Sequence, residues 1–151
     1  LNTGKYEPKL SIQTLANAMD VGNPSNWVRI QDLFDGDLMK LKEIVSSYTY
    51  SDEQTKVAMA ELFDKYKYIA CPHTAIAYLA SQAYRKDSPG SYASVFLSTA
   101  HPCKFPEAID SEAYKQVQLP KGAENLQNKP KFSEELKVDY EDFKNYLIRN
   151  K

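Results

Sequence analysis

Glycine is scarce in this chain and is spread thinly along it. Only five of the 151 residues are glycine, and they stand at widely separated positions. A loop that cradles a phosphate needs several glycines within a few residues, because its backbone N–H groups must approach the ligand closely. The spacing therefore excludes such a loop from these residues.

Cysteine is scarcer still, with two residues, and each lies near a histidine in Cys71-Pro-His73 and His101-Pro-Cys103. Two such pairs contain the ligand types of a zinc site. Zinc ligands are usually separated by about two to four residues, however, and the intervening prolines restrict the backbone. We therefore expect no metal site, and no disulfide in a cytoplasmic protein.

The chain also lacks an excess of either charge and lacks a long apolar run. Nineteen basic and twenty acidic residues leave a formal net charge of -1, so no overall field attracts nucleic acid or an anionic membrane. No apolar run approaches the roughly 20 residues that a membrane helix requires, and the amino end lacks a secretory pattern. We expect a cytoplasmic protein with no nucleic-acid or membrane partner. The first residue is not methionine, which suggests a chain already in progress.

What the sequence contains is the composition of an ordinary globular domain, with 42% hydrophobic and 26% charged residues. A chain of this length buries a core large enough for one domain, so we expect residues 1–151 to form a single domain. Capping residues and apolar residues at helical spacing predict several helices. These span residues 24–34, 38–45, 52–66 and 139–150, with Asn23, Asp37, Ser51 and Asp139 as caps, and a further helix begins at Pro72 and ends at the turn residues 87–90.

Residues 92–97 form a continuous rather than alternating run, which predicts a strand covered on both faces, as in a parallel sheet. Because this strand follows a helix and a turn, the predicted fold class is α/β, with helices packed on a small, mostly parallel sheet. The strand leads into the polar residues Ser98 and Thr99, and ligands bind at the carboxyl ends of such strands. Residues 113–131 show little periodicity and carry two prolines and a glycine, which predicts a long surface excursion.

Three segments carry distinctive sequences: AMDVGNPSNW at 18–27, PHTAIAY at 72–78 and LSTAHPCKF at 97–105. In this order they resemble the carboxyl-terminal third of threonine synthase, a pyridoxal-phosphate enzyme, over about residues 10–120. The resemblance implies the carboxyl-terminal part of a fold-type-II enzyme, of the tryptophan-synthase-β-like fold. The GPTxAFKD-type lysine motif and the SGNFG-type phosphate loop of that family do not occur here. We therefore expect a fragment that lacks the Schiff-base lysine and has no catalytic residue of its own.

The resemblance implies a cofactor-binding role for Thr99, because the threonine of the matching family motif hydrogen-bonds the pyridine nitrogen of the cofactor. A neutral hydroxyl leaves that nitrogen unprotonated and moderates carbanion stabilisation, whereas a carboxylate would keep the ring protonated. From the residues alone, Thr99 could instead cap the strand by bonding a local backbone group. Ser98, His101, Cys71 and Asn17 are expected to line the same pocket.

Cys71 departs from the family pattern, which commonly has Glu or Asp before the Pro-His pair. A thiol is a weak donor and presents a partly apolar surface. Either the pocket wall is less negative here, or a helix cap has been exchanged without consequence. His73 lies in the first turn of its predicted helix and is interpreted as a packing and capping residue rather than a general base, because helix N-termini disfavour a charged imidazole.

The resemblance also implies a function: the parent enzyme converts O-phospho-L-homoserine and water to L-threonine and phosphate, with pyridoxal 5'-phosphate as cofactor. Its implied partners are this small-molecule substrate and the missing amino-terminal part of the enzyme. The fragment alone is expected to be inactive, to bind no cofactor and to self-associate through exposed apolar faces. Two alternatives stay open: a non-catalytic binding or structural domain with the same half-fold, and another pyridoxal-phosphate enzyme such as a dehydratase.

Overall fold

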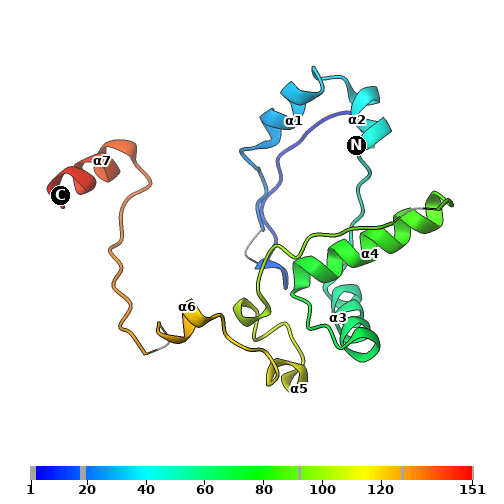
Figure 1. Ribbon diagram of the computed structural model, residues 1–151. Helices are drawn as coiled ribbons and strands as arrows, with labels where there is room; N and C mark the ends of the chain where they lie inside the picture. The colour runs from blue at the N-terminus through cyan, green and yellow to red at the C-terminus, as the bar shows by residue number, and fades with distance from the viewer. Residues whose placement is uncertain (1–2, 18–19, 92, 127, 151) are drawn as a thin grey trace. The chain divides into compact units, whose positions relative to one another are not determined.

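The computed structural model describes residues 3–17, 20–91, 93–126 and 128–150, and the chain divides into two compact units, Leu1–Gln118 and Leu119–Lys151. Figure 1 shows the helices of both units. The first unit contains α1 (Trp27–Leu33), α2 (Leu38–Ile44), α3 (Asp52–Tyr66), α4 (Pro72–Asp87), the 3-10 helix η2 (Pro102–Lys104) and α5 (Ser111–Tyr114). The second unit contains α6 (Lys121–Glu124) and α7 (Tyr140–Arg149).

Helix α3 begins and ends where local chemistry dictates. Ser51 and Gln54 form the predicted capping box, in which each side chain bonds the backbone N–H of the other. At the other end Lys67 adopts a left-handed backbone with φ 54. Its N–H donates to the Phe63 carbonyl at 2.9 Å, and the Tyr68 N–H donates to the Leu62 carbonyl at 3.2 Å. This Schellman-type ending fixes the direction in which the chain leaves α3.

The first two helices confirm one predicted cap and correct another. The Asp37 side chain accepts from the N–H groups of Met39 and Lys40, as expected for the cap of α2. The cap predicted at Asn23 is wrong, because α1 begins three residues later, with Asn26 at its cap position and no side-chain capping bond. The Trp27 N–H donates to the Pro24 carbonyl at 3.2 Å, so residues 24–27 form a turn before the helix.

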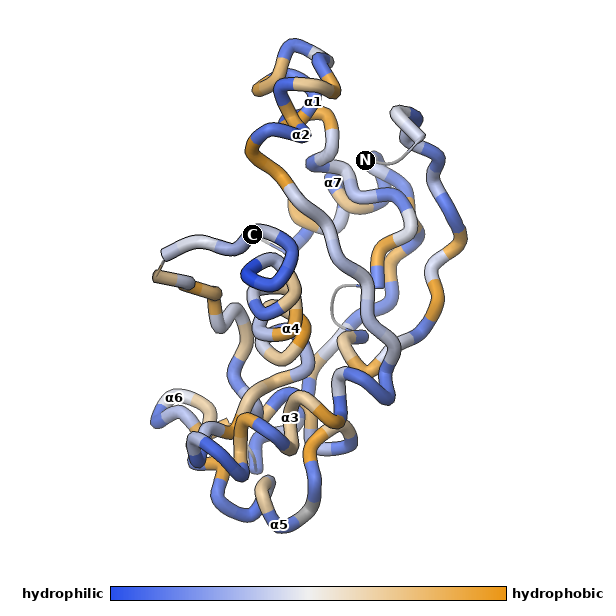
Figure 2. The backbone as a smooth tube through the Cα atoms, turned by 90° about the vertical axis from the view of Figure 1, so that its right-hand side faces the viewer, coloured by the Kyte–Doolittle hydropathy of each residue, from blue (hydrophilic) through white to orange (hydrophobic). Residues whose placement is uncertain are grey.

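Helices α3 and α4 pack against each other and carry the core of the first unit. Both helices present hydrophobic residues between hydrophilic ones along their length (Figure 2). Leu62 of α3 is 3% exposed and Ala75 of α4 is fully buried. The segment that follows η2 covers this pair with further buried residues, which are Phe105, Ile109 and Ala113.

No strand is assigned within the residues that the structure describes, so the predicted parallel sheet is not confirmed. Tyr92, where the predicted strand begins, lies outside the described residues. The side chains that follow alternate: Phe96 packs edge-on against Tyr78, with ring centroids 5.9 Å apart, whereas Val95 and Leu97 are 86% and 72% exposed. One face of this segment therefore rests on α4 and the other face is bare. A strand needs a hydrogen-bonded neighbour, and these residues have none in the described chain.

The second unit confirms the predicted carboxyl-terminal helix. Helix α7 spans ten residues, and the Asp139 carboxylate accepts from the Asp142 N–H at 2.9 Å, as an N-cap does. The surface excursion predicted for residues 113–131 contains the end of α5 and all of α6, and its character as an excursion stays a prediction. Within the described residues, no helix has both the length and the apolar character needed to cross a membrane.

Candidate functional site

The polar residues after the apolar run 93–97 are anchored to the start of α4. Ser98 Oγ accepts a hydrogen bond from the Tyr68 hydroxyl at 3.1 Å and another from the Thr74 hydroxyl at 3.2 Å. Thr74 Oγ1 also lies 3.2 Å from the Cys71 sulfur. We call Tyr68, Cys71, Thr74 and Ser98 the hydroxyl cluster. It joins the loop after α3, the first turn of α4 and the chain beyond residue 97.

The hydroxyl cluster differs in exposure along its length. Thr74 is fully buried and Cys71 is 1% exposed, whereas Tyr68 is 41% exposed. Buried hydroxyls in proteins are almost always hydrogen-bonded, because leaving one unpaired costs free energy. The Thr74 end of the cluster is thus held by burial as well as by its bonds.

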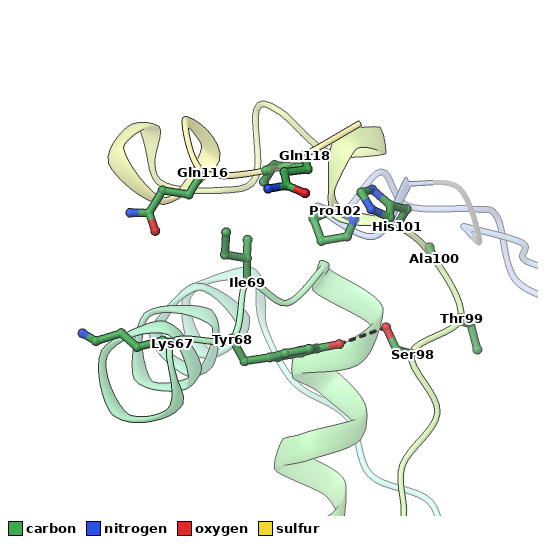
Figure 3. Close-up of a pocket in the computed structure, with 11 residues that line it drawn as sticks. Lys67, Tyr68, Ile69, Ser98, Thr99, Ala100, His101, Pro102, Gln116 and Gln118 are labelled. Atoms are coloured by element: carbon green, nitrogen blue, oxygen red, sulfur yellow. Dashed lines mark hydrogen bonds between the residues drawn. The ribbon is translucent and has the colours of Figure 1, made fainter. Parts of the chain in front are cut away.

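Thr99 lies beside the hydroxyl cluster but faces elsewhere. Figure 3 shows the Ser98 side chain directed toward Tyr68, while the Thr99 side chain points away from both Tyr68 and Ile69. Successive side chains of an extended segment point to opposite sides. Thr99 therefore shares the bare face of Val95 and Leu97. Thr99 is exposed, and its hydroxyl makes no hydrogen bond with the residues that the structure describes.

A pocket of about 520 Å³ in the first unit is bordered by residues 67–69, 98–102 and 116–118. In the view of Figure 3, Ile69 lies between Tyr68 and the side chains of Gln116 and Gln118, which also border the pocket. Ser98, Thr99 and His101 are among the predicted site residues that border the pocket, and Gln116 and Gln118 add amide groups to its wall. Asn17 does not border this pocket; it borders another, of about 450 Å³, together with Lys104 and Phe105.

The His101 side chain is hydrogen-bonded to the backbone of its own turn. Its Nδ1 atom accepts a hydrogen bond from the Cys103 N–H at 3.2 Å, which caps the short η2 helix. The Cys103 carbonyl in turn accepts from the Tyr114 hydroxyl at 3.3 Å. With Nδ1 accepting, a neutral His101 carries its proton on Nε2 and can donate only from that atom.

His73 packs against the core rather than bonding through its ring. Its ring lies 5.3 Å from that of Phe105, tilted by 57°. Both ring nitrogens are shielded from solvent, with no hydrogen-bond partner within the described residues. This environment agrees with the interpretation of His73 as a packing residue.

The segment that contains Asn17 is organised by carboxylates whose roles sequence reasoning missed. The Asp20 carboxylate accepts from both the backbone N–H and the hydroxyl of Thr14, each at 2.7 Å. The Asp52 carboxylate, at the first residue of α3, accepts from the Leu15 N–H at 3.2 Å. These bonds tie the amino-terminal segment to α3 and leave the Asn17 side chain exposed.

The structure thus brings two of the predicted site residues, Cys71 and Ser98, into one hydrogen-bonded group through Thr74. Thr74 and Tyr68 were not singled out from the sequence. For Thr74 a signal was available, because a residue three positions after Cys71 lies on the same face of a helix. For Tyr68 no local signal exists, since its partner Ser98 is 30 residues away.

Known proteins match this chain along almost its whole length. A family model described as "Threonine synthase, C-terminal" matches residues 74–147. The threonine synthase of Buchnera aphidicola subsp. Schizaphis graminum is 38% identical over 149 residues, which are 98% of this chain and 33% of that protein. The threonine synthase of Escherichia coli is 35% identical over 150 residues, covering 99% of this chain and 34% of that protein.

Solved structures give the same result. The crystal structure of threonine synthase from Escherichia coli matches with a TM-score of 0.79 at 34% identity, over 99% of this chain and 34% of that chain. A structure of threonine synthase from Brucella melitensis, described as bound to PLP, matches with a TM-score of 0.63 at 25% identity, over 87% of this chain and 33% of that chain.

The paired helices and the anchored segment after them therefore have the fold of part of these biosynthetic enzymes. The chain is similar to the carboxyl-terminal part of threonine synthases along almost its whole length. It spans about a third of the length of the curated relatives it matches. The resemblance read from the three sequence segments is confirmed.

Proposed function

We propose that this chain forms the carboxyl-terminal part of a cytoplasmic threonine synthase, as one domain of that enzyme. The complete enzyme converts O-phospho-L-homoserine and water to L-threonine and phosphate. The observation that carries the proposal is the match of 98% of this chain to one third of a threonine synthase, combined with the exposed position of Thr99 at the end of the anchored segment.

The residues present fit one end of a pyridoxal 5'-phosphate molecule. The Thr99 hydroxyl is exposed and can donate a hydrogen bond to a ring nitrogen. Pyridoxal phosphate supplies an electron sink for reactions at the carbons of an amino acid. Thr99 would hold the ring nitrogen through a neutral donor, which would not protonate it. The lysine and phosphate loop belong to the other two thirds of the enzyme, so this chain alone neither binds the cofactor nor turns over substrate.

The same proposal explains the bare face of residues 93–97. Val95 and Leu97 lie on the side opposite α4 and are largely exposed. In the complete enzyme we expect this segment to join a mostly parallel sheet contributed by the amino-terminal part, so that both faces are covered. Ser98, His101, Cys71 and Asn17 then lie in or behind the wall of the active site.

The test uses the polypeptide translated from the complete reading frame that contains residues 1–151. We expect it to bind pyridoxal phosphate, with the visible absorbance of the bound cofactor, and to release phosphate from O-phospho-L-homoserine as threonine forms. The Thr99→Val variant should lower cofactor affinity about tenfold, because a hydrogen bond to a buried ring nitrogen is lost. Thr49→Val, which removes an exposed hydroxyl elsewhere in the first unit, is the matched control.

Two results would overturn the proposal. If the complete frame encodes these residues alone and the product binds no cofactor, the chain is a binding or structural domain instead. If the longer product binds the cofactor but forms a keto acid rather than threonine, the protein is a dehydratase of the same fold. If the complete protein binds the cofactor and forms threonine, but Thr99→Val and Thr49→Val have the same cofactor affinity, the enzyme assignment stands and the role of Thr99 is wrong.

A further inference from the structure

The register of residues 95–99 is fixed by two inward side chains. Phe96 packs against the ring of Tyr78, a buried residue of α4, and Ser98 bonds to Tyr68 and Thr74. Because side chains of an extended segment alternate, this register places Thr99 on the opposite face. A shift of one residue would turn Thr99 toward α4 and expose Ser98.

A count of donors and acceptors shows how firmly Ser98 is held. A serine hydroxyl has one proton to donate and two lone pairs that accept. Tyr68 and Thr74 both donate to Ser98 Oγ, so both lone pairs are occupied. Ser98 is thus restrained from two directions, by a residue after α3 and by a residue within α4.

The same count orients the rest of the hydroxyl cluster. The Thr74 proton is directed to Ser98, so Thr74 Oγ1 meets the Cys71 sulfur as an acceptor. The Cys71 thiol therefore donates its proton to Thr74. Cys71 lies at the cap of α4 and is buried. It forms one end of a series of hydrogen bonds that continues through Thr74 to Ser98.

We propose that the hydroxyl cluster positions Thr99 for the ring nitrogen of the cofactor, with Thr74 as the central positioning residue. The inference rests on the proposed function, because Thr99 is the group that it serves. Tyr68, Cys71 and Thr74 act by holding Ser98, and through Ser98 the backbone that carries Thr99.

Thr74 offers a matched pair of variants. Thr74→Val keeps the branched shape that fills a fully buried site but removes the hydroxyl, which leaves Ser98 and Cys71 each without one partner. Thr74→Ser keeps the hydroxyl and removes a methyl group. A role in packing predicts the larger effect from Thr74→Ser, whereas a role in positioning predicts it from Thr74→Val.

The experiment uses the complete protein loaded with pyridoxal phosphate labelled with ¹⁵N in its ring. The ¹⁵N chemical shift of the ring nitrogen reports the hydrogen bond at that atom, and a fluorescence titration gives the dissociation constant of the cofactor. We expect Thr74→Val to move the ring-nitrogen signal toward its position in Thr99→Val and to raise the dissociation constant about fivefold, the loss of one modest hydrogen bond. Thr74→Ser and the surface control Ser94→Ala should leave both unchanged.

The outcomes separate this inference from the proposed function. If wild-type protein binds the cofactor but the ring-nitrogen signal is the same in Thr74→Val and Ser94→Ala, the positioning role is overturned and the enzyme assignment stands. If Thr74→Ser shifts the signal as much as Thr74→Val, packing rather than hydrogen bonding controls Thr99, and the inference is also wrong. If wild-type protein binds no cofactor, the proposed function itself fails.

Discussion

Tyr78 makes a polar bridge between the two long helices of the first unit. Its hydroxyl, on α4, donates to the Glu61 carboxylate of α3 at 2.8 Å, while its ring is buried and packs against Phe96. Burial first, and then the hydrogen bond to Glu61 and its negative charge, raise the pKa of Tyr78 from the ordinary value of 10.0 to about 12. Each cause disfavours the phenolate, which would be charged in a shielded place beside a carboxylate.

This shift predicts a loss of stability at high pH. Because the pKa is higher in the folded chain, the tyrosine retains its proton there after the unfolded chain has lost it. The stabilisation is complete below pH 10 and is lost as the pH rises toward about 12. Urea unfolding followed by circular dichroism should show a fall in the free energy of unfolding across this window. The fall should be smaller in Tyr78→Phe than in wild-type chain.

The control for this prediction is Tyr140→Phe, which removes an exposed hydroxyl from α7 in the second unit. As the pH rises, this variant should lose as much stability as the wild-type chain does, because Tyr78 is intact in both proteins. Equal slopes for all three proteins would show that the Tyr78 hydroxyl contributes nothing to alkaline unfolding.

At the scale of elements, the helices follow from local sequence. Helix α3 has the residue bounds predicted from the capping box and the apolar spacing, and α4 begins at the predicted proline. Both signals lie within the helix or one residue from it, so no distant contact is needed to form them. The cap of α1 was predicted wrongly because residues 24–27 close into a turn, which the Asn-Pro pair favours as readily as a helix start.

The strand and the site could not be predicted in the same way. The run 92–97 was expected to be covered on both faces, yet a strand depends on a neighbour that its own sequence does not encode. The contact of Tyr68 with Ser98 likewise joins segments 30 residues apart. The family motif predicted a site at the polar segment, but the connection of Ser98 to Thr74 and Tyr68 follows only from the folded chain.

The pairing of α3 with α4 predicts which apolar residues matter. Leu62 is 3% exposed in the core between the helices, so Leu62→Ala should lower the free energy of unfolding by about 2–5 kcal/mol. Val57 lies on the same helix but is 68% exposed, and Val57→Ala should change the free energy of unfolding by less than about 0.5 kcal/mol. Urea unfolding of both variants, followed at 222 nm, measures the difference. Similar losses in the two would contradict the placement of the core between α3 and α4.

At the scale of the whole chain, apolar surface is distributed unevenly between segments. The core of the first unit is closed over α3 and α4. Val95 and Leu97, by contrast, stand on one bare face of a segment that has no hydrogen-bonded neighbour within the described residues. Unpaired backbone groups beside exposed apolar side chains favour pairing with another chain. Under the proposed function the amino-terminal part of the complete enzyme would take that place, whereas in the isolated chain a second copy is the available partner.

We therefore predict that the 151-residue chain self-associates through residues 93–97. Sedimentation velocity over a concentration series should show a monomer that converts to dimers or larger species. Lysines at both exposed apolar positions, in the double variant Val95→Lys, Leu97→Lys, should weaken association, because each pairing would bring like charges together and bury them. The matched control is the double variant Val28→Lys, Val57→Lys, which adds the same charge at positions that are 64% and 68% exposed on α1 and α3. If both double variants weaken association equally, net charge rather than residues 93–97 controls association. If the wild-type chain stays monomeric, the bare face needs no partner, and the proposal that residues 93–97 join a larger sheet loses its support.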